Sequence, residues 1–259
     1  MLTGAYTMKR ASEKKHWDGF WAASRNLDDV YGTDRRIVEN LLRHVDVKGL
    51  RVLEVGAGTG RDAGELASLG ARVTALDYSE ESLSLMTSAV GDRALVVCGD
   101  ALSVPFADET FDVVYHQGLL EHFRNPAEVL DENIRVLRHG GILLVDVPQR
   151  YHYYTVMKHA LMAVGKWFAG WETEYTAGGL KRLAESRGVR VIALYGANLS
   201  PPVWYRGARK ILLKTGVRLP MYPAGPRWLG AIGRTLRSAT PERVRLNTAL
   251  VVGCVAKKP

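Results

Sequence analysis

The segment Gly56-Ala57-Gly58-Thr59-Gly60 places three glycines at alternate positions, between an apolar run that ends at Val55 and a stretch of helical periodicity that begins at Arg61. Glycines let the backbone approach a ligand closely and adopt conformations that are closed to other residues. The start of the following helix offers unpaired N–H groups and a partial positive charge. The segment therefore predicts a turn that binds a nucleotide-like cofactor.

An acidic residue ends the next apolar run, in Val73-Thr-Ala-Leu-Asp77-Tyr78. An acid at the end of the strand that follows a glycine-rich turn can accept hydrogen bonds from ribose hydroxyls. The simpler alternative is that Asp77 only caps the helix that follows it.

Two kinds of cofactor use such a turn. Dinucleotide enzymes carry G-x-G-x-x-G, and this chain has neither glycine nor alanine at Arg61 or Asp62 to complete that pattern. A nicotinamide-dependent oxidoreductase is therefore disfavoured by the spacing, but it stays open as an alternative.

The elements that must position these residues alternate regularly from Arg51 onward. Short β-branched apolar runs predict strands, and the stretches between them have helical periodicity. The predicted strands are 51–55, 72–76, 95–98, 111–116, 142–147, 189–195 and 248–256, and the predicted helices are 61–69, one beginning after Ser79, 126–138 and 177–186. Strands that alternate with helices at this spacing predict right-handed crossovers and a parallel sheet.

Four motifs in this order resemble class I S-adenosylmethionine-dependent methyltransferases. Glu54 lies two residues before Gly56, as in that family's first motif, [DE]-x-G-x-G-x-G. Gly99-Asp100-Ala101 resembles its adenine-binding segment, and residues 136–141 (Val-Leu-Arg-His-Gly-Gly) resemble its V-L-[KR]-P-G-G turn with His139 in place of proline. Residues 117–122 (Gln-Gly-Leu-Leu-Glu-His) resemble the methyltransferase type 11 subgroup, which includes enzymes that methylate ubiquinone and menaquinone. The resemblance covers roughly residues 50–196 and the last strand.

This resemblance implies an α/β, Rossmann-like fold: a seven-stranded, mostly parallel sheet whose last strand is antiparallel, with helices on both faces. It also implies S-adenosyl-L-methionine as the cofactor. The residues implied to bind it are Glu54, Gly56, Ala57, Gly58, Gly60, Asp77, Tyr78, Asp100, Ala101 and Gln117.

The implied roles differ along the cofactor. The glycines lie under its methionine moiety, with Glu54 bracing the turn. Asp77 holds the ribose hydroxyls, and Tyr78 lies against the adenine. Asp100 accepts a hydrogen bond from the adenine amino group beside the Ala101 N–H, and the Gln117 carbonyl faces the methionine ammonium.

His122 is the candidate catalytic residue, because imidazole exchanges protons near neutral pH and could deprotonate an acceptor hydroxyl or amine. The alternative is that His122 only packs within a helical turn. The histidines and the two cysteines lack metal-ligand spacing, so we expect no metal site. Cys98 and Cys254 lie in apolar runs and are expected to be buried free thiols, as in a reducing compartment.

The predicted organisation is an N-terminal helical segment (1–49) over the cofactor site and a methyltransferase domain (50–259) with two insertions. An aromatic insertion (149–175) follows the fifth strand, and a basic one (197–246) follows the sixth. Ligands bind at the carboxyl ends of parallel strands, so both insertions are expected to cover the acceptor pocket.

The net charge of +8 belongs mostly to the basic insertion. Residues 200–245 contain ten basic residues and one acid, Glu242, interleaved with apolar residues. This pattern suits an anionic acceptor or peripheral contact with a membrane surface, or is simply a solvated cationic face.

The leading hypothesis is thus a methyltransferase acting by in-line attack from a small-molecule, lipid-linked or biosynthetic acceptor. An RNA or protein methyltransferase that uses the basic insertion is the alternative. Nucleic acid is disfavoured, because 116–119 (His-Gln-Gly-Leu) stands where base N-methylating enzymes carry Asn/Asp-Pro-Pro-Tyr/Phe. A non-catalytic cofactor-binding protein also stays open. Without a secretory signal or an apolar run of about 18 residues, a cytoplasmic location is expected.

Overall fold

The computed structural model describes residues 14–23, 35–165, 172–198, 203–220 and 240–259. Its strands form one sheet in the order β3-β2-β1-β4-β5-β7-β6. The strands are β1 (Arg51–Val55), β2 (Arg72–Asp77), β3 (Ala94–Cys98), β4 (Phe111–Gln117), β5 (Leu137–Pro148), β6 (Arg190–Ala197) and β7 (Val251–Lys257). Strand β7 runs antiparallel to β5 and β6, and the other pairs are parallel. The predicted fold, including its antiparallel last strand, is confirmed.

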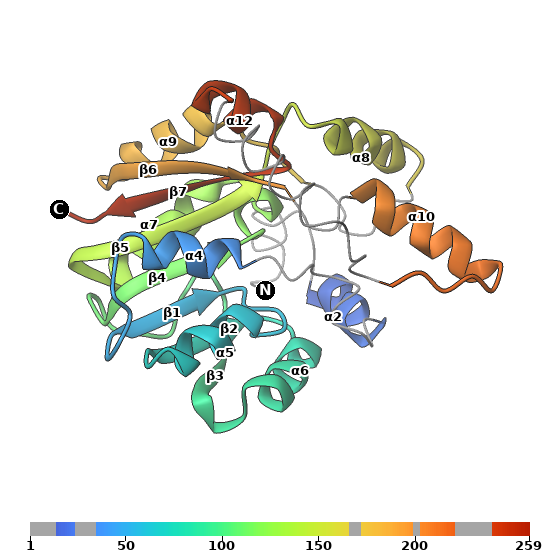
Figure 1. Ribbon diagram of the computed structural model, residues 1–259. Coiled ribbons are helices and arrows are strands. Elements are labelled where there is room, and N and C mark those ends of the chain that lie inside the picture. Colours follow the sequence, from blue (N-terminus) through green and yellow to red (C-terminus); the bar gives the residue numbers. More distant parts are fainter. Residues whose placement is uncertain (1–13, 24–34, 166–171, 199–202, 221–239) are drawn as a thin grey trace, which may run out of the picture.

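Helices cover both faces of the sheet (Figure 1). One face carries α4 (Arg36–Leu42), α5 (Arg61–Ser68) and α6 (Glu80–Val90), and the other carries α7 (Pro126–Val136) and α9 (Ala177–Ser186). Successive strand residues point to opposite faces, so on β1 Val52 packs with α4 and α5 whereas Leu53 packs with α7 and α9. The sheet is therefore buried on both sides, as a parallel sheet requires.

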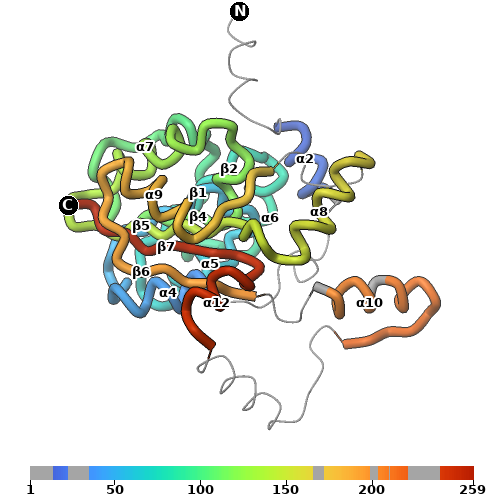
Figure 2. Tube along the Cα trace, turned by 90° about the horizontal axis from the view of Figure 1, so that it is seen from above, coloured from blue at the N-terminus to red at the C-terminus, as the bar shows by residue number. Residues whose placement is uncertain are grey.

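Three further helices lie past the carboxyl ends of the parallel strands (Figure 1). They are α2 (Lys14–Ala23), α8 (Tyr153–Ala163) and α10 (Val203–Lys214). Figure 2 shows that α10 stands at the periphery, away from the sheet. The helix α12 (Glu242–Thr248) instead packs beside β6, where the Arg245 carbonyl would lie 3.1 Å from a Cβ on Gly196. Two short 3-10 helices, η1 (Gly91–Arg93) and η2 (Leu120–His122), complete the described elements.

None of the helices in the described ranges is both long and apolar enough to cross a bilayer.

The turn before β5 differs from the prediction. The helix α7 ends at Val136, and β5 already begins at Leu137 instead of after Gly141. Leu137 pairs with Phe111, and the register then shifts before Val113 pairs with Ile142. A Cβ on Gly141 would lie 2.9 Å from the Asp112 carbonyl oxygen, so glycine permits the close approach of the strands at this irregularity.

The two cysteines are free, as predicted, but only Cys254 is buried. The prediction that Cys98 is also buried is wrong. Cys98 is exposed because it ends β3, the edge strand of the sheet, none of whose residues is fully buried.

Candidate functional site

A cavity opens at the carboxyl ends of β1 to β4. After β1 the chain adds β2 and β3 on one side and then crosses over to add β4 on the other, so the strand order reverses at β1. This reversal is the usual ligand site of an open α/β sheet. The cavity is lined by Trp17, Trp21, Gly56, Leu76, Asp77, Tyr78, Gly99, Ala101, Gln117, Gly118, Leu119, His122 and Phe123. Six of these belong to the predicted set: Gly56, Asp77, Tyr78, Ala101, Gln117 and His122.

The glycine-rich turn leaves β1 and enters α5 with a backbone that requires glycine. Gly56, Gly58 and Gly60 all have left-handed φ values, of 68°, 57° and 67°. A Cβ on Gly56 would lie 2.9 Å from Leu119 Cδ1, on the cavity wall. The three-glycine spacing of the sequence is therefore a steric requirement of this turn.

Asp77, the last residue of β2, holds this turn against the sheet. Its Oδ2 accepts the Gly58 N–H at 2.8 Å, and its Oδ1 accepts the Ser79 N–H at 2.9 Å. Burial raises the pKa of Asp77, although these N–H groups act in the opposite direction. A carboxylate offers about four acceptor positions, so Asp77 can still accept hydrogen bonds from a ligand in the cavity it lines.

Glu54 lies behind the turn and does not line the main cavity. Its Oε2 accepts the Ala63 N–H at 3.2 Å, in the first turn of α5. Burial and the nearby charge of Asp62 raise the pKa of Glu54 well above its usual range. Glu54 and Ala57 line a smaller adjoining cavity that reaches Gln117.

The end of β3 contributes backbone more than side chain. Gly99 and Ala101 line the main cavity, whereas the Asp100 carboxylate accepts the Leu102 N–H at 2.8 Å and is not among the lining residues. The implied contact between Asp100 and an adenine amino group stays a prediction.

The side chain of Gln117, at the end of β4, joins a buried polar network. With the amide assigned from its neighbours, its nitrogen faces Asp62 Oδ2 at 3.2 Å and its oxygen faces the Arg36 guanidinium at 3.1 Å. Arg36 pairs in turn with Asp146 at 3.0 Å, and the Tyr195 hydroxyl donates to the same carboxylate at 3.1 Å. The network fixes the β4 terminus, so the Gln117 main chain forms a rigid part of the cavity wall.

The helix α2 contributes two aromatic walls that the site prediction did not include, Trp17 and Trp21. Lys14 and Asp18 anchor the helix: Lys14 pairs with Glu80 at 3.1 Å, and Asp18 accepts a hydrogen bond from the Ser79 hydroxyl at 2.6 Å. The spacing of the two tryptophans by four residues could have signalled a shared helical face. It could not have signalled which surface that face covers.

His122 lines the cavity beside Trp17. The two rings pack edge to face, with their centroids 4.7 Å apart. His116, on β4, is fully buried, and burial lowers its pKa to about 3. His116 therefore stays neutral and out of contact with the cavity.

The two insertions are described only in part. Tyr151 and Tyr153 of the aromatic insertion are exposed and do not line the cavity. Trp167, Phe168 and Trp171, and the basic-insertion residues Arg227, Trp228, Leu229, Arg234 and Arg237, lie outside the described residues.

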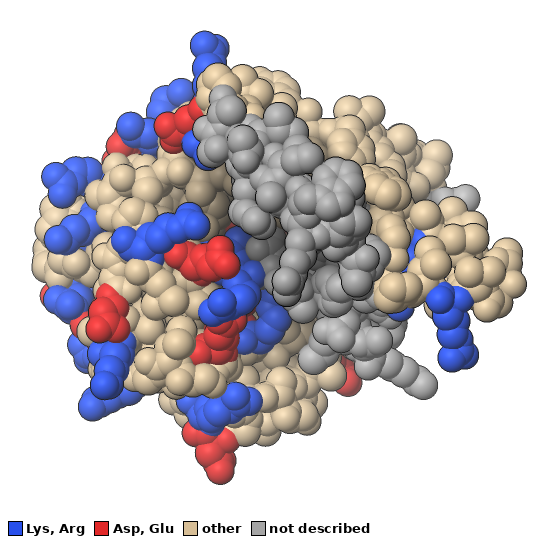
Figure 3. Space-filling view, viewed as in Figure 1, with Lys and Arg blue, Asp and Glu red and all other residues tan. Residues whose placement is uncertain are grey.

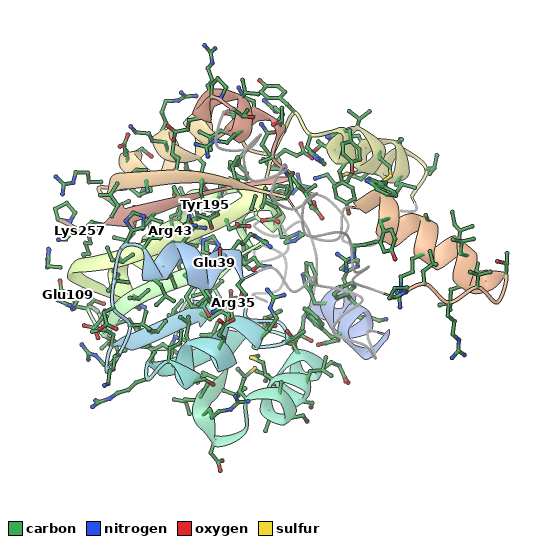
Figure 4. All side chains as sticks on the ribbon, in the orientation of Figure 1. Arg35, Glu39, Arg43, Glu109, Tyr195 and Lys257 are labelled. Carbon is green, nitrogen blue, oxygen red and sulfur yellow. The ribbon has the colours of Figure 1, made fainter. Side chains whose placement is uncertain are left out.

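A second, polar cavity lies between α4, β6 and α12. Glu39, Arg43 and Tyr195 converge on it (Figure 4). It contains none of the predicted site residues and has no glycine-rich turn, so the cavity at the strand ends is the candidate cofactor site.

The geometry of that site fits S-adenosylmethionine. A close-approaching turn can accommodate the methionine moiety, Asp77 keeps acceptor capacity for ribose hydroxyls, and Tyr78 with Leu76 offers apolar surface for the adenine. The same cavity is also lined by the aromatic and apolar side chains of Trp17, Trp21 and Phe123 and by His122.

Comparison with known proteins agrees with this geometry. Residues 53–145 match the protein family described as "Methyltransferase domain". A demethylmenaquinone methyltransferase of Clavibacter sepedonicus is 40% identical over 101 residues, which is 38% of this chain and 41% of that protein. A malonyl-[acyl-carrier protein] O-methyltransferase of Methylococcus capsulatus is 34% identical over 139 residues, which is 50% of each. The chain thus spans about half or less of the length of these curated relatives.

Among solved structures, the [4+2]-cyclase SpnF is similar with a TM-score of 0.64 and 19% identity, covering 97% of this chain and 98% of that one. At this identity the likeness concerns the fold alone. The family match, the order of the motifs and the sheet topology together identify the domain. The chain thus contains a methyltransferase domain of the class I, S-adenosylmethionine-dependent type.

Proposed function

We propose that the protein transfers a methyl group from S-adenosylmethionine to a small, largely apolar acceptor, such as a ring-bearing or lipid-linked biosynthetic intermediate. The observation that carries this proposal is the convergence of the ends of β1 to β4 on one cavity, which is lined by Gly56 of the glycine-rich turn, by Asp77 and by several aromatic side chains. The family match supports the same donor.

The proposed cofactor contacts follow the strand ends. Gly56, Ala57, Gly58 and Gly60 would lie beneath the methionine moiety, and Glu54 would brace them through the α5 N-terminus. Asp77 would accept the ribose hydroxyls. Tyr78, Asp100 and Ala101 would surround the adenine, and the Gln117 carbonyl would accept from the methionine ammonium.

The cofactor supplies a methyl group already activated on a sulfonium. The chain has to hold the acceptor nucleophile in line with that methyl group and to keep water away. Trp17, Trp21, Leu119 and Phe123 provide the apolar walls for both tasks. His122, on the same wall, would take the proton that the acceptor releases.

An apolar acceptor suits these walls better than a nucleic acid does. Near His122 the lining is aromatic and aliphatic, and among the described residues it includes no lysine or arginine. Phosphate-rich ligands need such cations for most of their affinity. The two relatives named above act, by their names, on a demethylmenaquinone and on a malonyl group carried by a protein, so the family accepts different small groups.

Asp77→Ala tests the donor site. We expect S-adenosylhomocysteine to bind about 10- to 100-fold more weakly in calorimetry, since hydrogen bonds to a charged group are lost. Asp77→Asn keeps the side-chain shape and should lose affinity as well, whereas Asp92→Ala, an exposed acid on η1, should bind normally. An unchanged dissociation constant in both Asp77 variants would contradict the assignment.

Binding alone does not establish methyl transfer, because a [4+2]-cyclase shares this fold. The wild-type protein should therefore be incubated with labelled S-adenosylmethionine and a panel of quinol, phenol and carboxylate acceptors. We expect labelled product with at least one apolar acceptor. Tight cofactor binding without transfer to any member of the panel would favour a non-catalytic or different chemical role.

A further inference from the structure

The helix α8 presents its apolar side to solvent. Tyr153, Val156, Met157 and Val164 are exposed, Val156 to 72%. Their spacing of three, four and eleven residues from Tyr153 places them in one stripe along the helix. A helix that merely covered the domain would turn this stripe inward.

The charged residue of α8 is instead turned into the protein. The side chain of Lys158 is 1% exposed, and its Nζ lies 2.9 Å from Glu172 Oε2 and 2.7 Å from Glu174 Oε1. Burial alone would lower the pKa of Lys158, but the two carboxylates outweigh it and raise the pKa. Removing the charges of Lys158, Glu172 and Glu174 from water costs several kcal/mol of desolvation free energy, which the attraction between the ammonium and the carboxylates must offset. The orientation of α8 is therefore fixed by a specific ion cluster, with the apolar stripe outward.

The helix α10 adds a second exposed apolar surface with a cationic side. Trp204 and Ile211, seven residues apart on one side, are both more than 60% exposed. Arg206 and Arg209 fall on the other side of the helix, and Lys214 lies at the edge of the side that carries Ile211. Residues 203–220 contain five basic residues and no acidic one. An apolar side flanked by lysine and arginine is typical of helices that lie in a membrane interface.

The two helices lie on the same side of the molecule, past the carboxyl ends of the strands (Figure 1). Burial and then Glu172 raise the pKa of Tyr154 on α8 to about 12, and the charge of Arg206 on α10 acts in the opposite direction. In Figure 3 this side is mostly uncharged, with lysine or arginine at its lower margin. Contiguous exposed apolar surface of this kind marks an interaction site.

We propose that α8 and α10 form a docking face for the surface of a lipid bilayer rich in anionic lipids. The docking face consists of Tyr153, Val156, Met157, Val164, Trp204, Ile211, Lys214 and Arg218. Its cations match anionic headgroups, whereas the same cations on a second copy of this chain would repel. Tyrosine and tryptophan at its margin suit the interface between headgroups and acyl chains.

Docking through this face would turn the strand-end side of the enzyme toward the bilayer. A lipid-borne acceptor could then reach the cavity without crossing water. The docking itself does not depend on the proposed methyl transfer, because binding to vesicles needs neither cofactor nor acceptor.

Cosedimentation with phosphatidylcholine vesicles, with and without phosphatidylglycerol, tests the docking face. We expect the full chain to bind vesicles that contain phosphatidylglycerol and to lose most of this binding at high salt. In Val156→Glu/Ile211→Glu, partitioning should fall at least about tenfold, because two apolar side chains no longer enter the interface. Both positions are exposed, so the fold should be kept, which circular dichroism can verify.

Two matched controls accompany these variants. Leu95→Glu/Ile192→Glu makes the same kind of change at exposed apolar positions on the sheet strands β3 and β6, and should bind like the wild type. Lys214→Glu/Arg218→Glu should weaken binding to anionic vesicles. Arg72→Glu/Arg190→Glu, at the first residues of β2 and β6 and with the same change in net charge, should weaken it far less.

Three outcomes would overturn the proposal. One is absence of binding to anionic vesicles, and another is equal binding by Val156→Glu/Ile211→Glu and wild type. The third is a concentration-dependent dimer in solution that Val156→Glu/Ile211→Glu dissociates and that does not bind vesicles, since the face would then join two copies of the chain.

Discussion

At the scale of single residues, His122 is the lining side chain of the cavity that is best suited to act as a general base. It lies on the wall shared by Trp17 and Phe123, where an acceptor would meet the methyl group. A base there matters only for an acceptor that must lose a proton, such as a hydroxyl or a protonated amine.

His122→Asn should lower kcat by about 10²- to 10⁴-fold for such an acceptor. The wild-type rate should fall at acidic pH, where imidazole is protonated, and the variant should lose this dependence. Steady-state rates between pH 5 and 9 measure both effects, and His44→Asn, an exposed histidine, is the control. An unchanged rate and pH profile in His122→Asn would mean that His122 only packs against Trp17.

Gly60 illustrates a second kind of residue-scale constraint. It has a left-handed φ of 67°, and a Cβ there would lie 2.8 Å from Met86 Cγ, between α5 and α6. Gly60→Ala should therefore lose about 1–3 kcal/mol of unfolding free energy because alanine disfavours the left-handed backbone. The overlap of the new Cβ with Met86 should add a further loss.

Gly49→Ala separates these two effects. Gly49 has a φ of 77° with no atom within 4 Å of a Cβ, so this variant should lose only the backbone part. Urea unfolding measures both variants. If Gly60→Ala loses no more than Gly49→Ala, the contact with Met86 does not constrain the turn.

At the scale of elements, α2 completes the cavity although it is remote in sequence from the strand ends. Asp18 accepts hydrogen bonds from the Lys14 ammonium at 3.1 Å and from the Ser79 hydroxyl at 2.6 Å. Burial raises the pKa of Asp18, but these hydrogen bonds outweigh it and lower the pKa. The Asp18 carboxylate, together with the Lys14–Glu80 pair, thus anchors the helix that carries Trp17 and Trp21.

Asp18→Ala should weaken S-adenosylhomocysteine binding about three- to tenfold, because α2 loses hydrogen bonds to a charged group and no longer holds the tryptophans in place. The melting temperature should change little, since α2 lies at the margin of the fold (Figure 1). Calorimetry and thermal unfolding measure the two quantities, with Lys15→Ala, exposed on the same helix, as the control. Normal affinity in Asp18→Ala would exclude α2 from the cofactor site.

At the scale of the whole molecule, the buried histidine of β4 links stability to pH. His116 is fully buried, and neither ring nitrogen has a hydrogen-bond partner among the described residues. Burial lowers its pKa from 6.5 to about 3 in the folded protein. Below pH 6.5 the unfolded chain therefore binds a proton that the folded chain does not. The unfolding free energy is therefore highest above pH 6.5, where both states are neutral at His116, and it falls as the pH drops toward 3.

We expect His116→Leu to lose this part of the acid sensitivity. Between pH 6 and 4 the unfolding free energy of the wild type should fall more steeply than that of the variant, by about 1.4 kcal/mol per pH unit. Urea unfolding at several pH values measures the difference, and His44→Leu should behave like the wild type. Equal slopes in the wild type and His116→Leu would mean that His116 is protonated in the folded state.

Much of this architecture follows from local sequence. The alternation of apolar runs with helical periodicity predicts the parallel sheet, because backbone geometry fixes which residues share a face. The glycines of the turn and Asp77 are equally local, since the turn needs left-handed backbone and Asp77 lies at the adjacent strand end. These features could be predicted because they depend on neighbours within a few residues or on the fixed order of strands.

Other features were decided only by long-range packing. Sequence spacing shows that Trp17 and Trp21 share a face and that Val156 and Lys158 point in different directions, but not which face meets the protein. Tertiary contacts place the tryptophans over the cavity, turn Lys158 toward Glu172 and Glu174, and leave the apolar stripe of α8 outside. A periodic pattern defines faces, whereas burial depends on partners far along the chain. The candidate cofactor site and the cationic segment proposed to meet a membrane were thus predictable from the sequence, whereas the place of α8 in that surface required the fold.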